Sequence, residues 1–349
     1  MTGGAILFTP RPAYRFRSQQ GIASAPNSAV RADSVPEGGD LTYYLPAALA
    51  DTAAAPDSAH PRRPAKLVVL GAGGDTVRVL EGERKLGLNR VWWDLRYTRP
   101  TVPKLRTPPP GKPFVRTGPD GTRPLVTWDL DLSLRGPLVP PGSYQVRLTL
   151  SDSAASVATL TQPLTVLKDP NTAATDSDVA AQTRLALAIR AAQDSVARMI
   201  NRLEWVRKQL AELSGQLRGD TALTGDSSAK RLATLADTLD RHAGGVEGAL
   251  FDVHLTGARE DAFRSPIQLY GRLAALQSDV SESGADFAPT SQQQAVYELF
   301  AQRLRDASVH FADFMARELP AFGAELRKAP LKDIVAGGVD AGAPSRTGP

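Results

Sequence analysis

The stretch NRVWWDLRY, from Asn89 to Tyr97, places two of the chain's four tryptophans side by side. Side chains of an extended strand point alternately to its two faces, so Trp92 and Trp93 cannot share a face. One face is apolar and is formed by Val91, Trp93, Leu95 and Tyr97. The other is polar apart from one ring and is formed by Arg90, Trp92, Asp94 and Arg96. The pattern predicts a half-buried strand with Trp93 in a core and Trp92 on the outer face, either covered by another segment or free to bind.

Other short runs with strand character surround this stretch between residues 40 and 168. They are rich in Val, Leu, Thr and Tyr, and turn sequences such as GAGGD and VPPGS separate them. We assign them to 41–45, 66–70, 76–80, 89–95, 124–130, 143–150 and 155–167. About seven short strands with this alternation predict an antiparallel β-sandwich over residues 40–168, with long loops at 50–65 and 99–122.

Residues 1–39 precede these strands as an extended arm rich in Pro and Arg. Within the arm, LFTPRPAYRFR (7–17) is expected to form a short edge segment. Proline lacks the backbone N–H that an interior strand needs, so this segment cannot lie in the middle of a sheet.

The hydrophobic period changes after residues 169–175, which we interpret as a linker. From Leu185 to Leu217, apolar residues recur in steps of four and three, and this heptad spacing predicts one long helix. A second run with the same spacing, from Leu232 to Val253, places His242 on its buried seam. Asp226 or Ser227 is the expected N-cap of this second helix.

Two further helices are expected towards the C-terminus. One begins near Ser265 and ends near Ser283, and the other extends from about Thr290 to Leu326, where Pro320 should kink or end it. About four helices joined by short polar loops predict an antiparallel helical bundle over residues 176–328. The Gly- and Pro-containing residues 329–349 are expected to form a disordered tail.

Composition excludes several kinds of site. The chain has no cysteine, which excludes disulfides, thiolate metal ligands and a cysteine nucleophile. The four histidines show neither HxxxH nor HExxH spacing, and no phosphate loop or GxSxG motif occurs, so we expect no metal, no cofactor and no catalytic residue. The basic residues form no dense stripe with aromatic residues between them, which argues against nucleic-acid binding. We also expect no membrane span and no signal peptide in this chain.

The densest charged cluster is GAREDAFRSP (257–266), directly before the third expected helix. Arg259, Glu260 and Arg264 are therefore candidates for an anion-binding or interaction site. The alternative interpretation is helix capping and ion pairing between helices.

Several stretches together resemble one protein family. These are the arm, GLNRVWWDLRY (87–97), PLVPPGSYQVRLTL (137–150), LTVLKDP (164–170) and TGAREDAFRSPIQLYGRLAAL (256–276). They look like the C-terminal region of bacterial sortilin-type β-propeller proteins with Asp-box (BNR) repeats, which are often labelled glycosyl hydrolases. The resemblance covers most of residues 5–325 and is most specific in the arm and in NRVWWDLRY.

This resemblance implies an Ig-like β-sandwich, similar to that of flagellar hook-capping proteins, followed by a helical segment. It also implies export to the cell envelope or the extracellular space, and a β-propeller as partner. The propeller itself is absent from these 349 residues, so no hydrolytic or ligand-binding residue can be carried over.

Three functions follow from these observations. The first is a non-catalytic accessory module that docks a propeller or another partner protein, with Trp92, Asp94, Arg96, Arg259, Glu260 and Arg264 as the candidate docking surface. The second is a carbohydrate-binding module that uses Trp92, because sugar rings stack on exposed aromatic side chains. The third is the accessory part of a glycoside hydrolase whose active site lies in the missing propeller.

Overall fold

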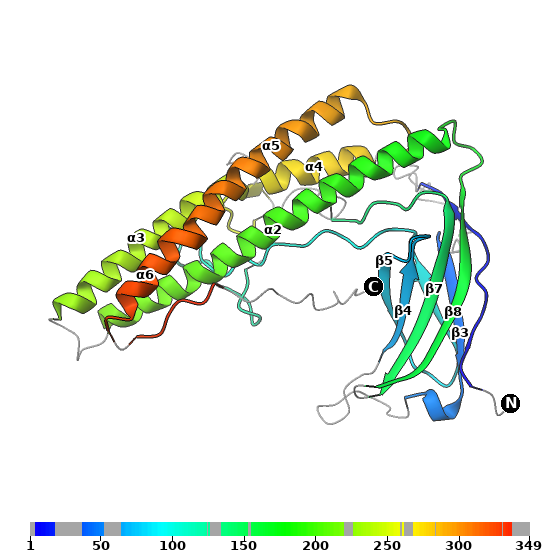
Figure 1. Cartoon of the computed structure of the whole chain (residues 1–349), viewed down its shortest axis with the longest axis horizontal. Coiled ribbons are helices and arrows are strands. Elements are labelled where there is room, and N and C mark those ends of the chain that lie inside the picture. Colours follow the sequence, from blue (N-terminus) through cyan, green and yellow to red (C-terminus); the bar gives the residue numbers. More distant parts are fainter. Residues whose placement is uncertain are drawn as a thin grey trace, which may run out of the picture. The chain divides into compact units, whose positions relative to one another are not determined.

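The computed structural model describes residues 4–17, 37–51, 64–123, 125, 134–152, 155–219, 226–258, 260–261, 268–282, 284–329 and 331–336. β-strands occupy the N-terminal half and helices the C-terminal half (Figure 1), which confirms the predicted order of β then α. The expected strand 124–130 with Trp128 and most of the expected loop 50–65 lie outside the described residues.

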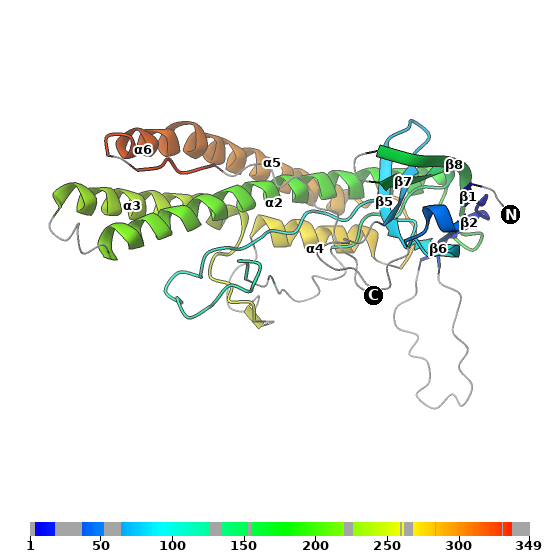
Figure 2. The ribbon, with the colours of Figure 1, turned by 90° about the horizontal axis from the view of Figure 1, so that it is seen from below.

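Within the described residues, eight strands form two sheets. Their bounds are β1 Ile6–Leu7, β2 Ala13–Arg15, β3 Gly39–Leu45, β4 Ala65–Leu70, β5 Thr76–Gly82, β6 Gly87–Trp93, β7 Gly142–Asp152 and β8 Ala155–Lys168, with a short 3-10 helix, η1, at Ala47–Leu49. Sheet A has the order β1-β3-β6, and sheet B has the order β2-β8-β7-β4-β5. Sheet B is curled (Figure 2).

The arm contributes an edge strand to each sheet, as its prolines predicted. β1 pairs antiparallel with β3 at one edge of sheet A. β2 of the arm pairs parallel with β8, whereas the strands between residues 39 and 168 pair antiparallel with one another, as predicted for that region. Pro10 and Pro12 lie between the two arm strands, where the chain passes from sheet A to sheet B. The two strands are not joined by a hairpin, so the chain direction is not reversed between them.

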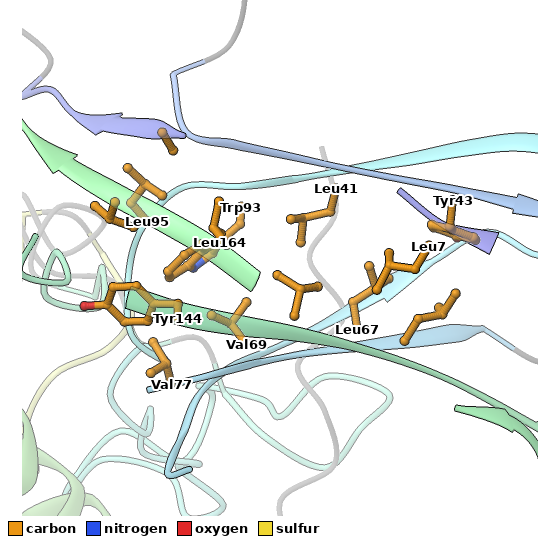
Figure 3. Close-up of a cluster of buried hydrophobic side chains, with 14 of the residues drawn as sticks. Leu7, Leu41, Tyr43, Leu67, Val69, Val77, Trp93, Leu95, Tyr144 and Leu164 are labelled. Carbon is orange, nitrogen blue, oxygen red and sulfur yellow. The ribbon is translucent and has the colours of Figure 1, made fainter. Parts of the chain in front are cut away.

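Both sheets contribute side chains to one buried cluster (Figure 3). Leu41, Tyr43 and Trp93 enter it from sheet A, and Leu67 and Val146 enter it from sheet B. Trp93 is fully buried and meets Tyr144 edge-on, with 5.7 Å between ring centroids. The prediction that Trp93 lies in a core is confirmed.

In the described part of the C-terminal half, five α-helices and one π-helical turn follow the strands. They are α2 Asp176–Gly219, α3 Ser227–Leu250, α4 Leu269–Ser281, α5 Ser291–Asp313, the π turn η4 Phe314–Glu318, and α6 Leu319–Leu326. Asp226 caps α3 by accepting from the backbone N–H of Ser228, as expected. Thr290 and Gln293 form a reciprocal capping box at the start of α5.

The heptad seam of α2 is confirmed over most of its length, since Ile189, Val196, Leu203 and Leu210 are all fully buried. The seam expected for α3 is wrong in its second half. Leu232 and Leu239 are buried in its first half, but His242 is exposed and its Nδ1 lies 2.8 Å from Glu318 Oε2. A straight helix drifts by about 20° per heptad from a strict seven-residue repeat, which moves burial from His242 to the next residue along the chain.

Pro320 neither ends nor breaks the last helix. The π turn η4 directly precedes it, and the backbone N–H of Leu319 donates to the carbonyl of Phe314, five residues earlier. The wider turn accommodates a residue that has no N–H to donate. The helix therefore continues through Pro320 to Leu326, and its type changes just before the proline.

The chain forms two compact units that interleave along the sequence. One, the sheet unit, comprises Met1–Arg99, Arg135–Leu187 and Ser281–Pro289, and the other, the helical unit, comprises Pro100–Leu134, Ala188–Val280 and Thr290–Pro349. Each unit thus contains residues from three separate parts of the chain.

Candidate functional site

The outer face of sheet A carries a row of apolar side chains across its three strands. In the register of the sheet, Ile6 of β1 is opposite Tyr44 of β3, and Tyr44 is opposite Leu88 of β6. Residues directly opposite each other point to the same face, so these three side chains are neighbours. Ile6 is 43% exposed and Leu88 is 69% exposed. A cross-strand apolar row in contact with solvent is a candidate interaction surface.

Further side chains extend this surface along the strands. Phe8, two residues beyond Ile6, is 42% exposed and donates its backbone N–H to the carbonyl of Thr42. Farther along the sheet, Trp92 is opposite Asp40, and Arg90 Nε lies 3.3 Å from Asp40 Oδ1. We call Ile6, Phe8, Asp40, Tyr44, Leu88, Arg90 and Trp92 the sheet A face.

The turn that leads into β6 is held by one buried side chain. Asn89 accepts from the backbone N–H of Lys85 at 3.0 Å and donates to the carbonyls of Lys85 at 2.8 Å and Gly87 at 3.1 Å. Gly87 has a φ of 91°, which glycine adopts without strain. These bonds fix the start of β6, so Leu88 is presented from a preorganised turn.

The structure separates the residues that the alternation of NRVWWDLRY had grouped on one face. Trp92 is half-buried on the sheet A face, as expected for the outer face of the strand. β6 ends at Trp93, and Leu95 has a φ of 54°, so the regular strand does not continue to Asp94 and Arg96. Leu95 is nevertheless buried in the core and Asp94 is exposed, as the alternation predicted.

Asp94 and Arg96 form bonds within the sheet unit instead. Asp94 is exposed, and its Oδ1 accepts from the backbone N–H of Arg96 at 3.2 Å. The Arg96 guanidinium binds both carboxylate oxygens of Glu282, at 2.6 and 3.1 Å, and donates to the carbonyl of Gly136 at 2.9 Å. Such a bidentate pair positions the segment after α4 in the sheet unit.

A second ion cluster, centred on Asp286, fixes the arm. The Asp286 carboxylate accepts from Arg15 and, at 2.5 Å, from Arg17 Nε, and both it and Arg15 are almost fully buried. Arg15 also donates from Nε to the carbonyl of Val139 at 2.8 Å. Although burial opposes the charged form, hydrogen bonds and charge from the two arginines lower the pKa of Asp286. This cluster is a structural element that holds β2 in place.

The candidate cluster 257–266 is only partly described. Glu260 is exposed in the helical unit, and Arg259 and Arg264 lie outside the described residues. The buried neighbour Asp261 accepts from the backbone N–H groups of Thr256, Gly257 and Ala258 at 2.5 to 3.1 Å. Asp261 therefore shapes its own loop and is not a ligand-binding carboxylate.

The sequence reasoning missed Ile6, Phe8, Tyr44 and Leu88. Each of them alternates with a buried neighbour, and that signal was readable within each strand. Their alignment into one surface depends on the register between strands, which alternation within a single strand does not provide. Within the described residues, no three His, Asp or Glu side chains are grouped closely enough to hold a metal ion. None of the described helices combines the length and apolar character that crossing a bilayer requires.

Comparisons with known proteins identify no family for this chain. No family model matches it, and no curated protein does. Among solved structures it is similar to a chain called pT26-6p, with 11% sequence identity and a TM-score of 0.15. The match covers 84% of this chain and 46% of that one, so this chain spans about half of its length.

Proposed function

We propose that this chain is a non-catalytic interaction module of an exported sortilin-type propeller system, located in the cell envelope or outside the cell. In this proposal, the sheet A face docks a β-propeller domain or another partner protein. The two sheets would form an Ig-like sandwich and the helices an antiparallel bundle, as the family resemblance implies. The shared buried cluster of the two sheets supports the sandwich.

The observation that carries the proposal is the cross-strand row Ile6–Tyr44–Leu88. Solvent-exposed leucine and isoleucine side chains gain free energy when a partner covers them, by roughly 25 cal/mol for each Å² of apolar surface buried. Ile6 and Leu88 offer no flat ring for a sugar, and Tyr44 is the one aromatic residue of the row, so the row favours a protein partner. The ion pair of Arg90 and Asp40 beside the row supplies the polar rim that is usual around such interfaces.

Binding of a purified propeller domain of the resembled family, measured by calorimetry, tests this proposal. Ile6→Ser and Leu88→Ser should each weaken binding about tenfold or more, because hot spots lie at the centre of apolar surfaces. Val79→Ser is the matched control, since Val79 is an exposed apolar residue of β5 in sheet B. Near-ultraviolet circular dichroism verifies that each variant is folded. Equal affinities for all three variants and the wild type would exclude the sheet A face as the docking surface.

A second candidate function rests on Trp92. Its ring is half-buried beside Arg90 and Asp40, and polar groups next to an aromatic ring are suited to the hydroxyls of a stacked sugar. Titration with polysaccharides tests this alternative. Carbohydrate binding that is lost in Trp92→Ala and kept in Leu88→Ser would favour it over protein docking. The third possibility, an accessory part of a glycoside hydrolase, requires that this chain co-purify with a catalytically active propeller.

A further inference from the structure

Helix side chains hold one segment of the helical unit, Thr101–Thr107, along α2. We call this segment the strap. The backbone N–H of Thr101 donates to Asp194 Oδ1 at 2.7 Å, and that of Lys104 donates to Asn201 Oδ1 at 2.6 Å. Pro103, Leu105 and Thr107 are buried, whereas Thr101 and Lys104 are exposed. The strap is thus an extended segment with one side against the helices.

The C-terminal end of the strap depends on one buried carboxylate. Glu204 Oε2 accepts from the backbone N–H of Arg106 at 2.6 Å and from that of Thr107 at 2.7 Å, and Oε1 accepts from Thr107 Oγ1 at 3.0 Å. Arg123 Nε donates to the Thr107 carbonyl at 2.8 Å. All three contacts use Glu204 as the acceptor, so the C-terminal end of the strap depends on this one carboxylate.

A second buried carboxyl group, Glu247 of α3, lies beside Glu204. Its Oε2 accepts from Arg207 Nη1 at 2.8 Å, and Arg207 Nε also binds Asp240 Oδ1 at 3.0 Å. Glu247 Oε1 is buried and accepts from no N–H or hydroxyl donor among the described residues, and the Glu204 carboxyl group lies within side-chain hydrogen-bonding reach of Glu247. Burial and the neighbouring charge of Glu204 raise the pKa of Glu247 to about 8, against the opposing effect of Arg207.

The balance of charges in this cluster depends on the Glu247 proton. Glu204 and Asp240 contribute two negative charges, and Arg207 and Arg123 contribute two positive charges. Asp261 is a further negative charge that acts on Arg123. Ionisation of Glu247 adds one more negative charge to this cluster, next to Glu204.

We propose that attachment of the strap to α2 requires a proton on the Glu247 carboxyl group. We call the two carboxyl groups of Glu204 and Glu247 the latch. When Glu247 loses this proton, its charge repels Glu204 within a buried site. Detachment of the strap relieves the repulsion, because water then reaches both carboxylates. The device would couple the pH of the surroundings to exposure of the strap and of the α2 surface beneath it.

The direction of the pH effect follows from proton linkage. The closed latch holds a proton that the open, solvated Glu247 releases, since an exposed glutamate ionises near its ordinary value of 4.5. The equilibrium constant for opening therefore rises with pH between about 5 and 8, by up to tenfold per pH unit. Above that window it no longer changes with pH. Below about pH 5 both states hold the proton, so opening no longer depends on pH.

Hydrogen–deuterium exchange of the whole chain, with intrinsic rates divided out, measures this opening directly. Peptides that contain Arg106 and Thr107 should lose protection steadily between pH 5.5 and 7.5, by up to tenfold per unit. In Glu247→Gln, which keeps the shape but cannot ionise, their protection should not change with pH. Thr107→Val removes one bond to Glu204 and should raise exchange at every pH while keeping the wild-type slope.

A peptide from α3 between Ala236 and Ala243 reports unfolding of the helical unit in the same samples. If it shows the same pH slope as the strap, the whole unit opens and the latch is overturned. A flat wild-type profile, or an equal slope in Glu247→Gln, would also overturn it. The wild-type profile alone decides the matter if Glu247→Gln does not fold.

Discussion

Replacing Asp286 by asparagine should destabilise the sheet unit severely. Asp286 is the carboxylate that binds both Arg15 and Arg17, and their side chains are only 1% and 8% exposed. Asparagine keeps the size but removes the charge, and so leaves two buried guanidinium groups without a counter-ion. Loss of one partner of a buried ion pair costs about 3–5 kcal/mol. That is a large share of the roughly 5–15 kcal/mol that stabilises a typical protein.

Urea unfolding with hydrogen exchange as readout measures this cost for each unit separately. Peptides of β7 report the sheet unit, and their unfolding midpoint should fall on the order of 1–2 M for a urea dependence of about 2–3 kcal/mol per M. Asp333→Asn is the matched control, because Asp333 pairs with Arg327 at 2.7 Å with both side chains about half exposed. Such an exposed pair contributes about 0–1 kcal/mol.

The same substitution predicts a dependence on acid. The pKa of Asp286 is lowered from its ordinary value of 3.8, so the stability that this carboxylate contributes is present above that value and is lost as pH falls towards the folded pKa. The difference between the wild type and Asp286→Asn should therefore shrink below about pH 4. Our assignment of the Asp286 cluster would be refuted if Asp286→Asn lowered the β7 midpoint no more than Asp333→Asn does.

Four further substitutions test other parts of the fold. Trp93→Ala should cost about 3–5 kcal/mol in urea unfolding, since it empties a fully buried site, whereas Trp92→Ala should cost less than about 2 kcal/mol; equal costs would contradict the assigned faces of β6. Asn89→Ala should cost about 1–3 kcal/mol, because buried backbone groups of the β5–β6 turn lose their partner, and faster amide exchange at Lys85 is the expected signature. Thr290→Ala removes half of the capping box of α5 and should cost about 1 kcal/mol, with exchange increased in the first turn of that helix alone.

Local alternation and periodicity predicted the elements of this fold but not their long-range connections. The side-chain period of a strand placed Trp93 in the core correctly, and the heptad repeat of α2 marked its buried seam. For α3 the same repeat failed at His242, because small residues such as Ala236 and Ala243 form the buried stripe and the helix follows its own period. For a helix shorter than α2, the heptad pattern alone therefore does not identify the buried face, which depends on the surface that packs against it.

The charged part of the candidate surface shows a different limit. Arg96 looked like an exposed strand residue, but its partner Glu282 is 186 residues away in sequence. Only the folded chain brings the segment after α4 into the sheet unit. The pattern around Trp92 held because it depended on neighbours within one strand, whereas the role of Arg96 depended on a distant segment.

The wide separation of Arg15 and Asp286 has a consequence for folding during synthesis. The two residues are 271 positions apart. At translation rates of about 5–20 residues per second, Asp286 follows Arg15 out of the ribosome after roughly 15–55 seconds. During that interval, pairing of β2 would bury arginine side chains that still lack their counter-ion. The early strands must therefore stay unpaired or pair only in part. The last step in building the sheet unit is therefore set by the arrival of a short segment from near the end of the chain.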